Sequence, residues 1–266
     1  MGFNEPAMSH FSTDAILLRK IEYGDHDFII SFLTRSKGKI SVIAKNAKKS
    51  VKRFTGALDL FSVNQIHCAY PKKKNNGLMI LSQADLENGF GNIRYDVFKT
   101  AYAGFWVELT HFWLEEGKPQ PELFDLLFFS LDMLNSGIIS GEVIHLLFQI
   151  RFMALSGFEP NIEYCGCCKT PLDMIEQNKV LFDFKEGRII CQNCIKRESR
   201  HGRAVSKGTL KQLFWINKND VNRVDRIKFS GLAIKEGEGL LESFIPFHIG
   251  REFKSLQFLK RLRQEK

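Results

Sequence analysis

Residues 165–194 read CGCCKTPLDMIEQNKVLFDFKEGRIICQNC, and the cysteine pairs at the two ends decide the fold of the region between them. Two residues separate the outer cysteines of each pair, a spacing that lets a tight turn direct both sulfurs at one metal ion. The 22 intervening residues contain β-rich runs at 180–184 and 188–190 around Lys185-Glu186-Gly187, which predicts a hairpin. The stretch therefore predicts a zinc ribbon.

Four thiolates fill the tetrahedral sphere of zinc and leave no position for a reacting water, so the predicted Zn²⁺ is structural. Cys167 is an additional thiol in the first pair, and spacing alone leaves open whether it replaces Cys168. We take the outer cysteines as the predicted ligands: Cys165, Cys168, Cys191 and Cys194.

Disulfide bonds are the alternative for so many thiols. The first residues, Met1-Gly2-Phe3-Asn4-Glu5-Pro6, have neither the charged segment nor the apolar core of a secretory signal. We therefore expect a reducing, cytoplasmic compartment in which zinc is the better interpretation.

Composition indicates a globular protein without membrane spans. The chain has 266 residues, 44% of them hydrophobic, which is enough for one to three compact units. The apolar run at 123–134 contains Asp125 and Asp132 and is shorter than the roughly 20 residues of a transmembrane helix. We expect no membrane partner.

The formal net charge of +8 is unevenly distributed. Residues 1–80 carry 13 Lys/Arg and 6 Asp/Glu (+7), residues 81–160 carry 4 and 11 (−7), and residues 161–266 carry 21 and 13 (+8). Such blocks favour different partners on different surfaces.

The first 85 residues contain five short β-rich runs separated by turn signals such as Ser36-Lys37-Gly38. The predicted strands cover residues 14–21, 28–34, 39–44, 61–69 and 78–84. Five short strands are typical of an OB-fold β-barrel, although their number alone does not exclude an SH3-like barrel.

After Gly91 the apolar residues recur at three- and four-residue steps, which predicts helices. The expected early helices cover residues 94–116, 122–134 and 140–155. Helical spacing returns at Ser206, a candidate N-cap, and again from Gly239 to the carboxyl terminus. We expect the late helices to pack on the early ones, so the fold class is α+β multidomain: a barrel, a helical bundle domain and an inserted four-cysteine zinc ribbon.

The stretch from Arg35 to Arg53 contains eight basic residues and no acidic one. Cationic side chains displace the counterions condensed on nucleic acid, so this run predicts contacts with a phosphate backbone. The predicted DNA-binding residues are Arg35, Lys37, Lys39, Lys45, Lys48, Lys49, Lys52 and Arg53. The alternative is a solvated, lysine-rich surface loop.

Aromatic residues lie beside this charge. Phe54 follows the basic run, and Tyr70 precedes a second cluster, Lys72-Lys73-Lys74. Rings next to cations could hold a single strand by stacking, whereas burial in the barrel is the alternative for each ring.

A further basic group follows the last predicted zinc ligand: Lys196, Arg197, Arg200, Arg203, Lys207 and Lys211. It could extend a nucleic-acid surface or serve as a hydrophilic exit from the ribbon, and the sequence favours neither.

Catalytic motifs are absent from the sequence. There is no P-loop, HExxH, GxSxG or dinucleotide-binding glycine pattern. Asp25, His26 and Asp27 are adjacent, but neighbouring residues in a strand or turn point in different directions, which favours a turn over acid–base chemistry. We expect no enzymatic activity.

Several runs of residues carry a family likeness. They are Asp14-Ala15-Ile16-Leu17-Leu18, Tyr23-Gly24-Asp25-His26-Asp27, residues 32–39 (FLTRSKGK), residues 42–49 (VIAKNAKK) and residues 244–255 (FIPFHIGREFKS). In this order, and with the cysteine quartet where many members carry a zinc ribbon, the chain resembles the bacterial RecO family of recombination and DNA-repair mediators. The likeness spans nearly the whole chain.

The resemblance implies an N-terminal OB-fold, a helical domain and an inserted zinc ribbon. We divide the chain accordingly into a nucleic-acid-binding barrel (1–85), the first helical part (86–160), the ribbon (161–199) and the second helical part (200–266).

The resemblance also implies a non-enzymatic role. Such a protein binds single- and double-stranded DNA, anneals complementary strands, and works with RecR to load RecA onto strands coated by the single-stranded-DNA-binding protein. The family's helical domain can receive the acidic C-terminal tail of that coating protein. In a bacterial cytoplasm it would join the nucleoid when bound to DNA. An RNA- or transcription-associated protein remains the alternative, because an OB-fold accepts either nucleic acid.

Overall fold

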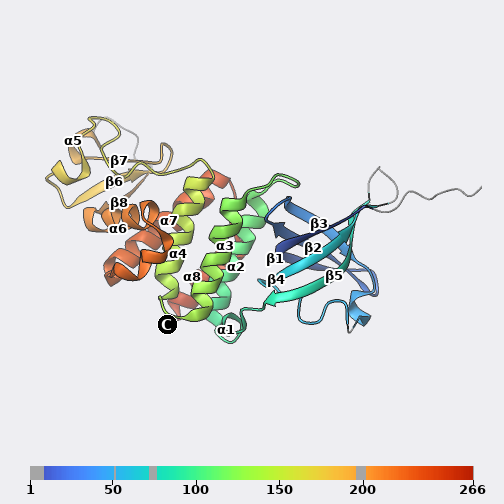
Figure 1. Ribbon diagram of the computed structural model, residues 1–266. Helices are drawn as coiled ribbons and strands as arrows, with labels where there is room; N and C mark the ends of the chain where they lie inside the picture. Colours follow the sequence, from blue (N-terminus) through green and yellow to red (C-terminus); the bar gives the residue numbers. More distant parts are fainter. Residues whose placement is uncertain (1–8, 51, 72–76, 196–201, 266) are drawn as a thin grey trace, which may run out of the picture. The chain divides into compact units, whose positions relative to one another are not determined.

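Five strands near the amino terminus close into a barrel, shown at the right of the computed structural model in Figure 1. They are β1 (His10–Tyr23), β2 (Asp27–Thr34), β3 (Gly38–Ala44), β4 (Val63–Ala69) and β5 (Met79–Asn88). Around the barrel the order is β1-β2-β3-β5-β4, and only β3 and β5 run parallel. This order is that of an OB-fold, so the predicted barrel type is confirmed.

The structure describes residues 9–50, 52–71, 77–195 and 202–265. The chain divides after Asn135 into two compact units. No helix in the described ranges is long and apolar enough to cross a membrane.

Every second side chain of a barrel strand points inward, and these side chains fill the barrel core. Along β3 the burial pattern alternates strictly, and Ile40, Val42 and Ala44 face a core that also contains Leu17 and Phe32. The pairing of β1 shifts register between Leu17 and Arg19, and this irregularity lets one long strand bend to pair with both β2 and β4.

The first unit continues with α1 (Gly91–Arg94), α2 (Val97–Trp113) and α3 (Pro121–Ser136). The predicted helix at 94–116 begins later, at Val97, because the Asp96 carboxylate caps it by accepting from the backbone N–H groups of Phe98 (2.8 Å) and Lys99 (3.0 Å). Helix α2 packs against β1.

The turn between β2 and β3 joins the barrel to the loop between α2 and α3. The Gly117 N–H donates to the Lys39 carbonyl (2.9 Å), and the Lys39 ammonium donates to the His111 carbonyl (2.8 Å). Gly38 has φ +69°, and a Cβ at this position would overlap the Lys118 carbonyl oxygen. Only glycine fits here, because both the backbone angle and the space exclude a side chain.

In the part of the second unit that the structure describes, four helices have more than ten residues. They are α4 (Gly141–Leu155), α6 (Lys207–Lys218), α7 (Gly231–Ile249) and α8 (Lys254–Gln264). Ser206 caps α6 as predicted, with its hydroxyl accepting from the Thr209 N–H. Helix α4 contacts α6 and α7, so the expected packing of late on early helices is confirmed for this early helix.

The predicted helical run from Gly239 to the carboxyl terminus starts too late and contains a break that the prediction missed. Helix α7 already begins at Gly231, where the Ser230 hydroxyl accepts from the Ala233 N–H. It stops at Gly250, whose φ of +68° ends the helix and makes α8 a separate element.

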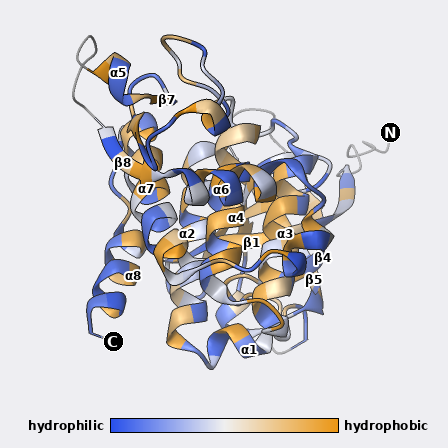
Figure 2. Cartoon of the chain, turned by 90° about the vertical axis from the view of Figure 1, so that its left-hand side faces the viewer, coloured by the Kyte–Doolittle hydropathy of each residue, from blue (hydrophilic) through white to orange (hydrophobic). Residues whose placement is uncertain are grey.

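Helix α8 completes a buried polar group. The His145 ring nitrogen lies 3.1 Å from a Glu242 carboxylate oxygen, and Arg263 donates to the same oxygen at 2.5 Å. Burial alone would raise the pKa of Glu242, but the hydrogen bond from His145 and the charge of Arg263 outweigh it and lower the pKa. Figure 2 shows hydrophobic positions interrupting the hydrophilic surface of α8, where Leu256 and Leu259 are buried.

The ribbon forms a three-stranded sheet in the order β7-β6-β8. Its elements are β6 (Lys179–Asp183), β7 (Arg188–Ile190), α5 (Gln192–Ile195) and β8 (Gly202–Ser206). The hairpin of β6 and β7 was predicted, whereas β8 was not. Its residues lie in the basic stretch for which a nucleic-acid surface and a hydrophilic exit both remained open. The short 3-10 helices are η1 (Ala47–Lys49), η2 (Leu172–Met174) and η3 (Val221–Arg226).

The glycine at the β2–β3 turn yields a test of the barrel–helix junction. Gly24 also has a positive φ (+56°) but has open space around its Cα, so Gly24→Ala should cost only about 1 kcal/mol of backbone strain. Gly38→Ala adds the overlap with Lys118, and we expect it to lower the free energy of unfolding by at least about 2 kcal/mol more. Urea denaturation followed by circular dichroism measures both; equal costs would contradict the described junction.

Candidate metal centre and nucleic-acid interface

The four predicted ligands meet at one point. The sulfurs of Cys165, Cys168, Cys191 and Cys194 all lie within 4.8 Å of one another, and those of Cys168 and Cys191 are 3.7 Å apart. Tetrahedral zinc with Zn–S bonds of about 2.3 Å places its sulfurs about 3.8 Å apart. Cys167 is not part of this group, so Cys168 is the fourth candidate ligand. The residues present fit a metal ion.

Local backbone geometry directs the thiols. In the first pair the Lys169 N–H donates to the Cys165 carbonyl (3.0 Å), and Lys169 takes the left-handed φ of +62°. In the second pair the Cys194 N–H donates to the Cys191 carbonyl (2.9 Å) as α5 begins. The Cys191 N–H also donates to the Cys165 sulfur (3.3 Å), which joins the two turns.

The electrostatics of the site favour a bound cation. Hydrogen bonds from the Thr170 hydroxyl and backbone lower the pKa of Cys168 to about 6. Burial, followed by the neighbouring sulfurs of Cys191 and Cys168, raises the pKa of Cys194 well above the usual range. Four crowded thiols cannot all ionise unless a positive charge offsets their repulsion, and a divalent ion supplies that charge.

The acid-free basic stretch divides into two groups at opposite ends of β3. Lys45, Lys48, Lys49, Lys52 and Arg53 lie around η1 and are called the η1 cluster below. The other three, Arg35, Lys37 and Lys39, lie at or before the start of β3. Seven residues of extended strand, roughly 20 Å, separate the two groups, so the eight residues do not form one patch.

The β1–β2 turn supports the η1 cluster. The Lys48 N–H donates to the His26 carbonyl (3.1 Å), and the Asp27 carboxylate accepts from the Asn46 N–H (2.8 Å). Residues 24–26 form the turn and Asp27 begins β2, so the interpretation of Asp25-His26-Asp27 as a turn is confirmed for Asp25 and His26.

Within the η1 cluster the side chains differ in availability. The Lys48 ammonium pairs with Glu22 (2.8 Å), and the Arg53 guanidinium donates to the Lys45 carbonyl (2.7 Å). Lys45, Lys49 and Lys52 are exposed, and in the part of the chain that the structure describes none of them has an ion-pair partner. These three lysines are the cations most available to a phosphate.

At the other end of β3 two of the three basic residues serve the fold. Arg35 pairs with Asp125 of α3 at 2.9 Å. The Lys39 ammonium is held by the His111 carbonyl, and burial lowers the pKa of this lysine. The Lys37 ammonium lies 4.6 Å from the centre of the Phe11 ring.

The two candidate aromatic residues have different environments. Phe54 is only 5% exposed and belongs to the barrel core, so it cannot receive a base. Tyr70 is 39% exposed and its ring contacts Phe11. Sequence reasoning missed Phe11, because its position beside Tyr70 arises from the pairing of β1 with β4.

The described members of the second basic group contact their own unit. Arg203 donates to the Gly239 carbonyl (3.2 Å), Lys207 to the Ile175 carbonyl (2.5 Å), and Lys211 pairs with Asp173. These contacts favour a structural role for the three residues. The predictions for Lys196, Arg197 and Arg200, and for Lys72-Lys73-Lys74, lie outside the described residues.

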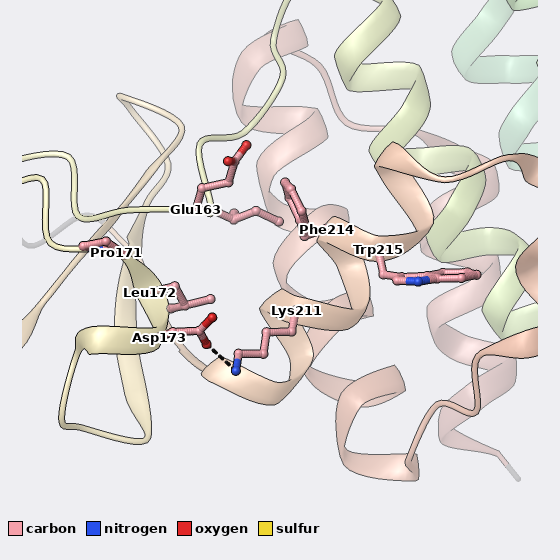
Figure 3. Close-up of a pocket in the computed structure, with 8 residues that line it drawn as sticks. Glu163, Pro171, Leu172, Asp173, Lys211, Phe214 and Trp215 are labelled. Atoms are coloured by element: carbon pink, nitrogen blue, oxygen red, sulfur yellow. Dashed lines mark ion pairs between the residues drawn. The ribbon is translucent and has the colours of Figure 1, made fainter.

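Figure 3 shows the pocket beside the Lys211–Asp173 ion pair, between the η2 segment of the ribbon and α6. It encloses about 270 Å³ and is lined mainly by apolar side chains, including Leu172, Phe214 and Trp215. Glu163 also lines the pocket. The ion pair links the η2 segment of the ribbon to α6.

Two family models match the chain. "Recombination protein O N terminal" covers residues 8–90, and "Recombination protein O C terminal" covers residues 94–257. With the barrel, the helices and the four-cysteine ribbon, these matches define a multidomain recombination protein.

Curated relatives agree along nearly the full length. The chain is 44% identical to the DNA repair protein RecO of Desulfatibacillum aliphaticivorans over 257 residues, covering 97% of this chain and 99% of that protein. It is 37% identical to the DNA repair protein RecO of Desulfosudis oleivorans over 259 residues, covering 96% and 99%. The corresponding protein of Syntrophus aciditrophicus is 32% identical over 254 residues, covering 95% and 96%. The chain belongs to the RecO family, as its motifs indicated.

The cysteine geometry predicts which thiol is dispensable. We expect Cys191→Ser to abolish metal binding and to expose the amides of β6 and β7, because a small sheet without a metal at this site cannot hold its fold. Cys167→Ser, in the same segment, should keep both metal and protection. Metal analysis of the purified variants and hydrogen exchange measure the two effects. Loss of zinc from Cys167→Ser with retention in Cys168→Ser would overturn the ligand assignment.

Proposed function

We propose that this protein is a non-enzymatic mediator of recombinational DNA repair. Family membership supports the role in DNA repair and recombination. The observation that carries the DNA-binding part is the η1 cluster, in which three exposed lysines without ion-pair partners among the described residues lie on an OB-fold barrel. The protein binds single- and double-stranded DNA through this charge, and its compartment is the bacterial cytoplasm.

The proposed annealing of complementary strands depends on the same positive charge of the η1 cluster. Two complementary strands repel each other through their phosphates, and a cationic surface that binds both lowers this repulsion and raises their local concentration. The activity requires no covalent step, so we assign no catalytic residue.

The partners are proposed from the family. With RecR, the protein helps load RecA onto single strands coated by the single-stranded-DNA-binding protein, whose acidic C-terminal tail is received by the helical part of this chain. The zinc ion at Cys165, Cys168, Cys191 and Cys194 has a structural role in this scheme, since four thiolates complete its coordination sphere.

Charge reversal of the three available lysines tests the DNA-binding assignment. Lys45→Glu/Lys49→Glu/Lys52→Glu should weaken binding to any DNA sequence on the order of 100-fold near 0.1 M salt and should flatten the slope of log K against log salt by about 2 to 3. Fluorescence anisotropy over a salt series measures both quantities.

A matched control separates local contacts from net charge. Lys185→Glu/Lys228→Glu/Lys254→Glu makes the same change in charge at exposed positions of the second unit and should affect binding far less. Unchanged affinity of the η1 variant at matched salt would sink the assignment, and tighter binding to matched RNA would favour the RNA-associated alternative.

The mediator role has its own test. Complementary strands coated with the cognate single-stranded-DNA-binding protein should anneal faster when this protein is added. The gain should diminish when the coating protein lacks its acidic C-terminal tail. No acceleration on coated strands, with normal acceleration on bare ones, would remove the partner from the proposal and leave DNA binding in place.

A further inference from the structure

Two aromatic rings and a lysine meet on the barrel away from the η1 cluster. The ring centres of Phe11, at the start of β1, and Tyr70, directly after β4, are 5.4 Å apart and inclined at 46°. The Lys37 ammonium lies 4.6 Å from the centre of the Phe11 ring. Phe11 packs against the barrel core, whereas Tyr70 is 39% exposed. The outer ring is therefore open to solvent and the inner ring supports it.

Backbone and side-chain neighbours flank Tyr70 on both sides. The Tyr70 N–H donates to the Ser9 carbonyl (3.1 Å), next to the register pair of His10 with Ala69. After Tyr70, the chain passes Pro71, whose Cβ would lie only 2.9 Å from a Cβ placed on Gly77. An exposed ring on a hydrogen-bonded backbone loses less conformational entropy when a ligand stacks on it than a ring on an unrestrained loop.

A hydrogen bond next to Lys37 restrains the turn that carries this lysine. The side chains of Thr13 and Ser36 share a hydrogen bond of 3.0 Å, which holds the β2–β3 turn to β1. Within the described ranges Lys37 has no ion-pair partner, unlike its neighbour Arg35, which pairs with Asp125. The barrel surface at Tyr70 thus presents an aromatic ring beside the ammonium of Lys37. Proteins use an aromatic ring next to a cation to hold a base and its phosphate.

We propose that Tyr70, supported by Phe11, is a stacking site for one unpaired nucleobase, and that Lys37 contacts the adjoining phosphate. This inference rests on the proposed function, since it requires that the protein bind nucleic acid. It adds a discrimination that the η1 cluster cannot make: charge attracts single and double strands alike, whereas the faces of paired bases are covered by their neighbours. A strand that follows the barrel from the η1 cluster to Tyr70 is held by charge at one end of β3 and by stacking at the other.

The experiment compares three probes at one salt concentration. They are a thymidine oligonucleotide, an abasic strand with the same number of phosphates, and a duplex of matched phosphate count. Tyr70→Ala should weaken binding of the thymidine strand by roughly 5- to 100-fold and leave the abasic strand and the duplex unchanged. Tyr70→Phe should retain wild-type binding, because it keeps the ring.

Controls separate stacking from folding. Tyr95→Ala removes a tyrosine of the same unit that is 93% exposed, and it should leave binding of all three probes unchanged. Circular dichroism melting of Tyr70→Ala and Tyr70→Phe checks that both variants fold. Phe11→Leu keeps an apolar side chain against the core and should weaken only the thymidine strand, because the supporting ring is lost.

The outcomes distinguish this inference from the proposed function. Equal losses on all three probes, or no loss on any, would overturn the stacking site while the response of the η1 variant still supports DNA binding. A wild-type protein that binds the thymidine and abasic strands equally would also overturn it. If the wild-type protein binds none of the probes, the proposed function fails first.

Discussion

Closure of the barrel by the parallel pairing of β3 with β5 determines where every candidate DNA contact lies. The pairing rests on two register positions, Val42 with Met79 and Ile43 with Ile80. Once these strands pair, no sheet edge remains and every connecting segment must leave at one end of the barrel or the other. The basic residues that adjoin β3 are thereby divided between two ends. In the same closed barrel, the antiparallel pairing of β1 with β4 places the segment after β4 beside the start of β1, where Tyr70 meets Phe11.

The ribbon depends on two supports of different kinds. Its strands β6, β7 and β8 have only three to five residues each, and its four clustered thiols form a site where a bound metal would add stability. The second support is aromatic: Phe182 of β6 meets Phe244 of α7 edge to face with ring centres 5.2 Å apart. Gly187, in the β6–β7 turn, lets that turn approach the same phenylalanine closely. A metal at the thiol cluster would thus organise the ribbon, and the aromatic contact packs the ribbon on α7 of its own unit.

Features encoded within a few residues could be predicted from the sequence. Alternation along residues 39–44 predicted the two faces of β3. The cysteine spacing predicted the metal centre, and Ser206 predicted the start of a helix. Features that depend on distant pairing could not be predicted. Strand β8 can be recognised only from its pairing with β6, because its own five-residue sequence, GRAVS, is short and half polar. Likewise, the binding of the Lys39 ammonium to the His111 carbonyl joins residues 72 positions apart, and nothing near Lys39 indicates that this lysine is unavailable to DNA.

Arg263 in α8 gives the basic carboxyl-terminal helix a role in the core. Its guanidinium reaches two carboxylates of α7, lying 2.8 Å from Glu238 and 2.5 Å from Glu242, and the latter carboxylate is almost fully buried. Leaving such a group without its cation costs several kcal/mol, because a buried charge loses the water that would otherwise solvate it. Arg263 of α8 therefore supplies the positive charge that compensates these carboxylates of α7. A truncation that trimmed this lysine- and arginine-rich segment as a dispensable tail would leave an uncompensated negative charge inside the second unit.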